Sequence, residues 1–499
     1  GQPVAMPALV GIEMWERFSF YGMQAIMVFF LYHQASDGGL GLDRAQATAL
    51  MGAYGGAVYL CTIAGGWVAD RVMGAERTLL AGALCLVAGH LALSVLDGGR
   101  GVATGMALVA VGSGALKTAA ITVLGHVYPR EDEARRDTGF QFFYLGINIG
   151  ALLGPLLTGW LAARHGYHVG FGAAAALMVL GLAHYLLLRP RLLASLEPSV
   201  RTAVQRPDSP LPRRRAAATV ALALAFVALL VLAVATGRLP LGSLATLLLA
   251  LTAGAAVALF LRIFTSPRVS APERRRAAAF IPLFLASSAF WSVLNQTYGV
   301  FAVYSDVRLD RHVGGFEMPA AWTQSFNPAY ILLLSAPMAM VWTRLGQRSP
   351  GSATKMSLGV SISGCGMLCL LPFTGGGAGS IPVLALALAV LVITLGELLV
   401  GPVGMSATAS HAPTAFRARF SALYFLSMAL GTSLAGVLSR WYDPEQAAVE
   451  ARYFLACGLG AVGIGLATAV LTRILARPRQ TPSSPAPTAP LAGTASPAA

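Results

Sequence analysis

Long apolar runs alternate with short polar segments along nearly the whole chain. About 20 apolar residues span a bilayer as a helix. Backbone polar groups in lipid must be bonded within their own segment, and runs this long are unsuited to barrel strands. The pattern therefore predicts an all-α polytopic membrane protein with fourteen transmembrane helices, near residues 8–32, 46–69, 78–96, 102–124, 139–161, 170–188, 216–236, 241–264, 277–301, 320–343, 355–374, 381–408, 420–439 and 453–472.

The order of the runs divides the chain into two similar halves. Residues 1–188 are predicted to form an N-terminal six-helix bundle, and residues 277–476 a C-terminal six-helix bundle. Residues 189–276 between them indicate a cytoplasmic linker followed by an inserted two-helix hairpin. Residues 477–499 are rich in Pro, Ser, Thr and Ala and are expected to be disordered. Two six-helix halves in one bilayer favour a transporter with its site between them.

Composition supports a membrane protein and excludes several other classes. Hydrophobic residues make up 56% of the chain, charged residues only 11%, and the mean hydropathy is +0.67. A soluble domain usually has about 25% charged residues. The net charge of +14 lies in short loops rather than in a basic stripe interleaved with aromatic residues, so we expect no nucleic-acid partner.

The uneven distribution of Lys and Arg over the loops predicts the orientation. If the N-terminus is cytoplasmic, the loops on that side carry roughly three times as many of these residues as the opposite loops, in agreement with the positive-inside rule. Both termini are therefore expected to be cytoplasmic.

Five charged residues lie unusually deep inside the predicted spans. The first span holds Glu13, Glu16 and Arg17; Lys117 lies far into the fourth span, and Glu397 lies in the middle of a span of the second half. A charge at a helix centre costs about 2.5–3.5 kcal/mol on insertion scales and indicates function. The alternatives are an ion pair near the membrane surface, a structural pair between Lys117 and a glutamate of the first helix, and a protonated Glu397 bonded to a backbone carbonyl.

The signs of these charges suit a zwitterionic substrate. Glu397 can hold an ammonium group, and Lys117, with Arg17 beside it, can hold a carboxylate. Because Lys117 and Glu397 belong to opposite halves, a bridging ligand would favour closure. A substrate that occupies the cation would also change the proton affinity of the neighbouring glutamates, which couples the substrate to a proton.

Several stretches resemble the proton-dependent oligopeptide transporter (POT) family of the major facilitator superfamily. They are Glu13-Met14-Trp15-Glu16-Arg17-Phe18-Ser19-Phe20-Tyr21-Gly22, the loop 65–77, Phe143-Tyr144-Leu145-Gly146-Ile147-Asn148-Ile149-Gly150, Phe326-Asn327-Pro328 and Gly396-Glu397-Leu398. The resemblance covers about residues 8–472, and the inserted hairpin is similar to that of bacterial members.

The resemblance implies proton-coupled symport of di- and tripeptides by alternating access, in the inner membrane of a bacterium. It assigns proton coupling to Glu13, Glu16 and Arg17, with Glu16 as the expected proton carrier. Lys117 and Glu397 would bind the peptide carboxylate and amine. The remaining residues expected to bind substrate are Tyr21, Tyr59, Asn148, Asn327, Trp291, Tyr424 and Phe425; for the aromatic ones, plain helix packing is the alternative.

Three positions depart from the pattern of this family. Gln24 and Asn295 stand where many peptide-transporting members carry an arginine and an acid that would pair at the outer gate, and Phe20 replaces a tyrosine. Because both charges are absent, neither one is left without its partner of opposite charge. The neutral pair nevertheless leaves the proton stoichiometry open, and we keep Gln24 and Asn295 among the candidate substrate-site residues.

Two other functions remain as alternatives to peptide symport. One is a family member that carries another small solute, such as an amino-acid conjugate or an anion; the other is a transporter-like sensor that binds peptide without moving it. The sequence has no metal-ligand cluster, nucleophile–base pair or phosphate loop that would indicate an enzyme. We expect no cofactor besides the coupling protons, and a monomer in the lipid bilayer.

Overall fold

The computed structural model describes residues 6–128 and 133–476, and it is almost entirely helical. Within these ranges, 13 helical segments are long and apolar enough to cross a membrane. The first helix, α1, has 27 residues and carries Glu13, Glu16 and Arg17 in its first half. The predicted all-α polytopic fold is confirmed. The tail 477–499, predicted to be disordered, lies outside the described residues.

The N-terminal bundle consists of six long helices. They are α1 (Met6–Tyr32), α2 (Arg44–Val68), α3 (Ala75–Val95), α4 (Gly98–Val127), α5 (Glu133–His165) and α6 (Tyr167–Ser195). Glycines allow α5 to pack closely on α1: a Cβ atom at Gly150 would lie 2.5 Å from the carbonyl oxygen of Met14. Small residues of this kind let membrane helices approach each other closely.

The C-terminal bundle consists of α10 (Ala271–Leu294), α11 (Val300–Val307), α12 (Phe326–Leu345), α13 (Ser352–Leu368), α14 (Val383–His411), α15 (Arg417–Leu438) and α16 (Ala447–Ala476). A capping box starts α10, in which the Ser270 and Glu273 side chains exchange hydrogen bonds with each other's backbone. The predicted single helix 277–301 is divided: α10 gives way to a 3₁₀ turn at Asn295–Tyr298 before α11 begins.

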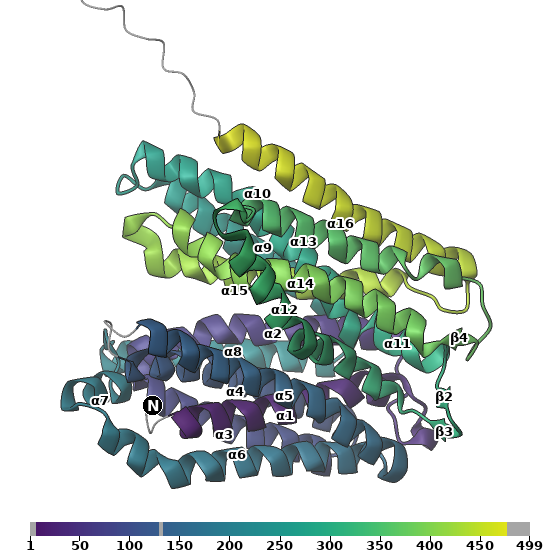
Figure 1. Ribbon diagram of the computed structural model, residues 1–499. Coiled ribbons are helices and arrows are strands. Elements are labelled where there is room, and N and C mark those ends of the chain that lie inside the picture. Colours follow the sequence, from purple (N-terminus) through teal and green to yellow (C-terminus); the bar gives the residue numbers. More distant parts are fainter. Residues whose placement is uncertain (1–5, 129–132, 477–499) are drawn as a thin grey trace, which may run out of the picture.

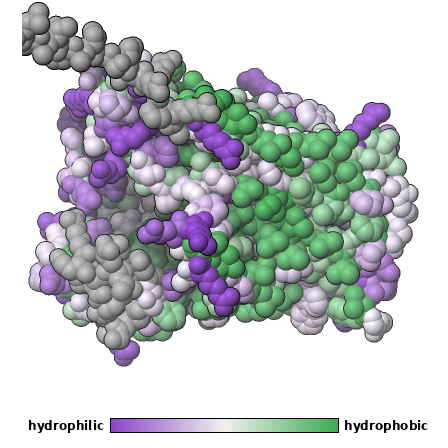
Figure 2. All heavy atoms as spheres, turned by 45° about the horizontal axis from the view of Figure 1, so that its top comes forward, coloured by the Kyte–Doolittle hydropathy of each residue, from purple (hydrophilic) through white to green (hydrophobic). Residues whose placement is uncertain are grey.

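Between the bundles, the linker contains the short helix α7 (Pro198–Gln205), and α8 (Arg213–Ala235) and α9 (Ser243–Thr265) form the inserted hairpin. Ala245 of α9 packs against Ala49 and Ala53 of α2. The side chains of α8 are largely exposed, with Leu222 at 72%. Such a helix is suited to contact with lipid, and Figure 2 shows a broad hydrophobic area on the surface bordered by hydrophilic residues.

Two strand pairs lie at one end of the bundles, which we call the strand face, and the sequence pattern did not predict them. The pairs are β1 (Leu309–Asp310) with β4 (Ile381–Pro382), which is parallel, and β2 (His312–Val313) with β3 (Phe316–Glu317), which is antiparallel. The opposite end, where α1 begins, is called the N-terminal face. Figure 1 shows the two bundles lying one above the other, with the strands at the right.

The two bundles contact each other toward the strand face. The 3₁₀ segment Ala320–Ser325 before α12 inserts against the N-terminal bundle, where Trp322 donates to Leu156 O (2.9 Å), Gln324 to Ala25 O (3.1 Å) and Ser325 to Leu152 O (2.8 Å). Along α2 and α15, Gly52 lies so close to Gly436 that a Cβ atom on Gly52 would be 2.3 Å from the Gly436 Cα. These contacts close the strand face.

Candidate functional site

The α1 charges form a buried network. The Arg17 Nε atom lies 3.0 Å from Glu13 Oε1 and 2.7 Å from Glu16 Oε2, and Ser113 of α4 donates to Glu16 Oε1 at 2.7 Å. The side chains of all three charged residues are at most 4% exposed. Two carboxylates share one guanidinium, so the three groups sum to one excess negative charge when neither glutamate is protonated.

Lys117 has no carboxylate partner within ion-pair distance among the described residues. Its Nζ atom lies 5.4 Å from the centroid of the Tyr59 ring, a cation–π arrangement between α4 and α2. The side chain is only partly buried, and it lies within electrostatic range of the α1 network. The structure therefore does not contain the ion pair with Glu13 or Glu16 that was the structural alternative for Lys117.

Glu397 lies in the middle of α14, and within the described chain no cation pairs with it. Its Oε2 atom accepts a hydrogen bond of 2.7 Å from the Asn327 side chain, which also donates to Thr394 at 3.0 Å. The carboxylate is partly exposed. Asn327 at the start of α12 thus orients a carboxylate that has acceptor capacity to spare.

Aromatic rings from both bundles meet between these charges. Tyr21 of α1 stacks on Tyr298 at 6.2 Å between ring centroids, and Tyr59 of α2 lies 6.2 Å from Trp291 of α10. Each of these two pairs therefore crosses from one bundle to the other. Glu397 lies within electrostatic range of Tyr21 and Tyr59, which places the acid on the same interface.

Two tyrosines belong to this group although they were not among the predicted site residues. Tyr298 stacks on Tyr21, and Tyr144, in the matched Phe143–Gly150 stretch, is 48% exposed and lies within electrostatic range of Glu397. Tyr298 lies one helical turn after Asn295. This spacing from a residue already selected in the sequence could have identified Tyr298 as a site residue.

The other predicted residues occupy less direct positions. Tyr424 of α15 lies within electrostatic range of Glu397, and its ring meets that of Phe425 at 5.6 Å. This contact with the Tyr424 ring connects Phe425 to the aromatic residues of the site. Asn148 is 5% exposed, and its side-chain amide donates to the carbonyl of Tyr144 on its own helix (2.9 Å).

The neutral pair lies together toward the strand face. Gln24 and Asn295 line one small cavity of about 10 Å³, which also borders Thr48, Met51 and Gly52. That volume is about enough for one water molecule. The Gln24 Oε1 atom is buried without a hydrogen-bond partner, whereas the Asn295 amide donates to Trp291 O at 2.8 Å.

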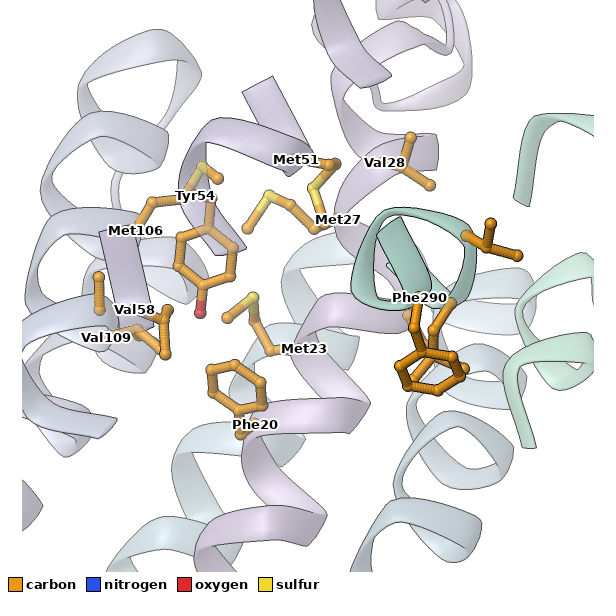
Figure 3. Packing of buried hydrophobic residues seen from close by; sticks show 14 of the residues in the cluster. Phe20, Met23, Met27, Val28, Met51, Tyr54, Val58, Met106, Val109 and Phe290 are labelled. Carbon is orange, nitrogen blue, oxygen red and sulfur yellow. The ribbon is translucent and has the colours of Figure 1, made fainter. Parts of the chain in front are cut away.

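Phe20 fills an apolar layer beside the α1 network. Its ring stacks on Tyr54 with centroids 6.1 Å apart, and the Arg17 guanidinium carbon lies 5.4 Å from the centre of the Phe20 ring. Figure 3 shows Phe20 and Tyr54 with Met23 and Met106 packed around them. Phe20 therefore separates the charged network from the space nearer the strand face by hydrophobic packing.

The arrangement offers an ammonium group on one bundle and a carboxylate on the other, each without a partner of opposite charge. A small molecule with a carboxylate and an amine could satisfy both, and the tyrosine hydroxyls and Asn327 could bond groups between them. The two bundles and this interfacial site define a secondary transporter of the major facilitator type.

Comparisons with known proteins identify the family. The sequence model of the POT family matches residues 76–455. An uncharacterized transporter, YclF, of Bacillus subtilis is 36% identical over 478 residues, covering 96% of this chain and 95% of the relative. A di-/tripeptide transporter of Lactococcus lactis subsp. cremoris is 34% identical, covering 96% of each chain. A crystal structure of a peptide transporter POT in complex with sulfate superposes with a TM-score of 0.89 at 36% identity, covering 95% of each chain. The chain belongs to the POT family.

Proposed function

We propose that the protein is a proton-coupled symporter that imports di- and tripeptides by alternating access. The observation that carries this proposal is the pair formed by Lys117 and Glu397, which lie on opposite bundles and both lack an ionic partner in the described chain. A peptide would place its carboxylate on Lys117 and its amine on Glu397. The name of the Lactococcus relative supports peptides as the substrate class.

Coupling follows from the charges around Lys117. With Lys117 cationic, its positive charge offsets the excess negative charge of Glu13, Glu16 and Arg17. A bound substrate carboxylate takes up that positive charge, and the buried network is then left with an uncompensated negative charge, which is costly away from water. A proton on Glu16 restores the balance, so substrate and proton bind together.

The driving force is sufficient for accumulation. One proton that moves down about 100 mV yields roughly 2.3 kcal/mol, and each pH unit adds about 1.4 kcal/mol. The two together support a peptide gradient of several hundred-fold.

The membrane placement and the assembly belong to the same proposal. The loop charges favour a cytoplasmic N-terminal face and a periplasmic strand face in a bacterial inner membrane. The closed strand face then corresponds to a conformation that has its site turned toward the cytoplasm. We further propose that the protein works as a monomer, with the proton as its coupling ion.

A second candidate is transport of another small zwitterion or anion. The neutral Gln24 and Asn295 favour it, because they change the polarity near the site relative to the family pattern. A single experiment separates the candidates: uptake of labelled dialanine into proteoliposomes under an inward proton gradient, with di- and tripeptides and free alanine as competitors. We expect peptides to block uptake and alanine to leave it unchanged. Absence of dialanine binding would contradict the proposal, and binding without uptake would indicate a sensor.

A further inference from the structure

A second cluster of titratable side chains joins the bundles at the strand face, apart from the substrate site. His33, just after α1, places Nε2 at 2.8 Å from Asp306 Oδ2 of α11, and the Tyr32 hydroxyl donates to the same oxygen at 2.5 Å. The Tyr167 hydroxyl, at the start of α6, lies 2.6 Å from His33 Nδ1. The side chains of His33 and Asp306 are 28% and 19% exposed, so solvent at the strand face reaches both.

The cluster lies on the same two polypeptide segments as the neutral pair. His33 follows Gln24 by about two and a half turns of α1, and Asp306 follows Asn295 on the segment that passes through the 3₁₀ turn into α11. Gln24 and Asn295 are neutral, but the same two segments carry His33 and Asp306 nearer the strand face. These two side chains connect the N-terminal bundle to the C-terminal bundle.

The hydrogen-bond partners of His33 determine which ring nitrogen carries the hydrogen in its neutral form. Asp306 only accepts, so the imidazole must donate from Nε2, and Nδ1 then accepts from the Tyr167 hydroxyl. Both nitrogens of this neutral tautomer are satisfied. If Nδ1 takes a proton from solvent, it becomes a donor, the Tyr167 oxygen becomes its acceptor, and the bond to Asp306 becomes an ion pair with a charge-assisted hydrogen bond.

Other charged side chains surround the His33–Asp306 pair. Asp306 is also approached by Arg311 at 3.6 Å, but Arg311 is shared with Glu317 at 3.2 Å. The remaining charged or titratable neighbours are Asp37, within electrostatic range of Tyr167; Arg44, whose guanidinium lies 5.9 Å from the Tyr32 ring and pairs with Glu445; and His168, which lies 3.8 Å from Asp97.

We propose that His33 and Asp306 form a gate at the strand face, which is held closed more firmly when His33 carries a proton taken from the medium on that side. They act as positioning residues in the transport cycle: the proton on His33 stays at the gate and differs from the one carried by the α1 network. Histidine is suited to this role because it changes charge between pH 5 and 8. The inference rests on the proposed function, since it assigns the gate to a transport cycle.

The test compares His33→Gln with a matched control in proteoliposomes. A glutamine amide can still donate to Asp306 and accept from Tyr167, but it cannot titrate. Dialanine uptake is measured while the pH on the strand-face side is varied from 8 to 6 at fixed potential and fixed pH on the other side. We expect acidification to stimulate uptake about fivefold less in the variant than in the wild type. A factor of this size corresponds to the difference in free energy between a charged and a neutral hydrogen bond.

The control is Glu445→Gln, which breaks a second ion pair of the strand face, with Arg44 at 2.8 Å, that contains no histidine. It should keep the wild-type pH profile. The double variant His33→Gln/Asp306→Asn should show the same pH profile as His33→Gln alone, because the pH dependence assigned to the gate is already lost with the imidazole. Peptide exchange at equal pH on both sides reports whether each variant is folded and active.

Two outcomes distinguish the gate from the proposed function. If the wild type shows gradient-driven uptake and His33→Gln keeps its full pH profile, the gate assignment is wrong while the symport proposal stands. If the wild type shows no gradient-driven uptake at all, the proposed function is wrong. Loss of acid stimulation in His33→Gln but not in Glu445→Gln would support the gate.

Discussion

At the residue scale, Glu397 is a carboxylate in the middle of a membrane helix that is held by an asparagine rather than by a cation. The hydrogen bond from Asn327 (2.7 Å) fixes its orientation, while no cation of the described chain pairs with its charge. A carboxylate in such a position costs free energy, which its function must justify. The role of Glu397 can therefore be separated from the role of Asn327 by experiment.

Substitution Glu397→Gln should weaken binding of peptides that have a free amine by about 10- to 100-fold, because a hydrogen bond to a charged group is worth roughly 1.5–3 kcal/mol. Binding can be measured by calorimetry on the purified protein. N-acetylated dialanine serves as the control, since it has no ammonium for Glu397 and should bind both forms alike. Equal affinity of the variant and the wild type for dialanine would refute the assigned role.

Lys117 provides the complementary prediction at the same scale. Lys117→Gln removes the positive charge that offsets the α1 network but keeps a polar side chain beside Tyr59. Gradient-driven dialanine uptake should fall to the background of empty liposomes. Lys355→Gln, whose Nζ also lies over an aromatic ring, that of Trp342 at 4.1 Å, should stay active as the matched control. Full activity of Lys117→Gln would leave Lys117 with a structural role.

At the scale of elements, the contact between α2 and α15 is built from residues too small to keep the helices apart. Gly52 faces Gly436, and Gly55 and Gly56 face Thr432 and Ser433 in the same way. The contact lies in the strand-face half of α2. Since the transport cycle requires this face to open and close, the glycines determine how tightly the closed form packs.

Gly52→Val should therefore disfavour closure of the strand face. Overpacking of a tight contact costs about 1–3 kcal/mol, so uptake should slow by roughly tenfold while peptide still binds. Gly254→Val on α9 is the matched control, because a Cβ atom there meets open space. The rate of uptake and peptide binding can be measured on the same proteoliposomes. If Gly52→Val transports at the wild-type rate, the closed contact is unimportant for the cycle.

The elements also show where sequence patterns were sufficient and where they were not. Apolar runs of membrane length identified the long helices because lipid forces the backbone to bond within each segment. Run length did not reveal that the helix predicted at 170–188 continues to Ser195 through Pro190, or that a 3₁₀ turn divides the helix predicted at 277–301. These features depend on packing between helices and leave the hydropathy of the run unchanged.

Part of the candidate site could also be predicted from the sequence. Charges inside membrane helices are rare, so Glu13, Glu16, Arg17, Lys117 and Glu397 stand out in one sequence. Aromatic residues do not stand out, and the site membership of Tyr298 and Tyr144 became apparent only when the fold placed them against Tyr21 and near Glu397. The His33–Asp306 contact likewise joins residues far apart in the chain, which no local pattern reports.

At the scale of the whole molecule, the two bundles carry complementary parts of one mechanism. The N-terminal bundle holds the cation and the α1 network, and the C-terminal bundle holds the acid. In the proposed mechanism, a ligand that bridges them would link substrate binding to closure of the interface. The hairpin of α8 and α9 lies outside this arrangement and is joined to the 3₁₀ turn after α15 by Arg440, which donates to Gly242 O (3.2 Å) and Thr246 Oγ1 (2.9 Å).

Peptide and proton should move together through this network, and a direct measurement of proton flux tests this coupling. Proteoliposomes that contain a pH-sensitive dye receive external dialanine at equal pH on both sides, with an inside-negative potential. We predict that dialanine acidifies the interior for the wild type, and that Glu16→Gln abolishes this acidification but keeps dialanine exchange. Dialanine uptake by the wild type without any acidification would contradict proton-coupled transport.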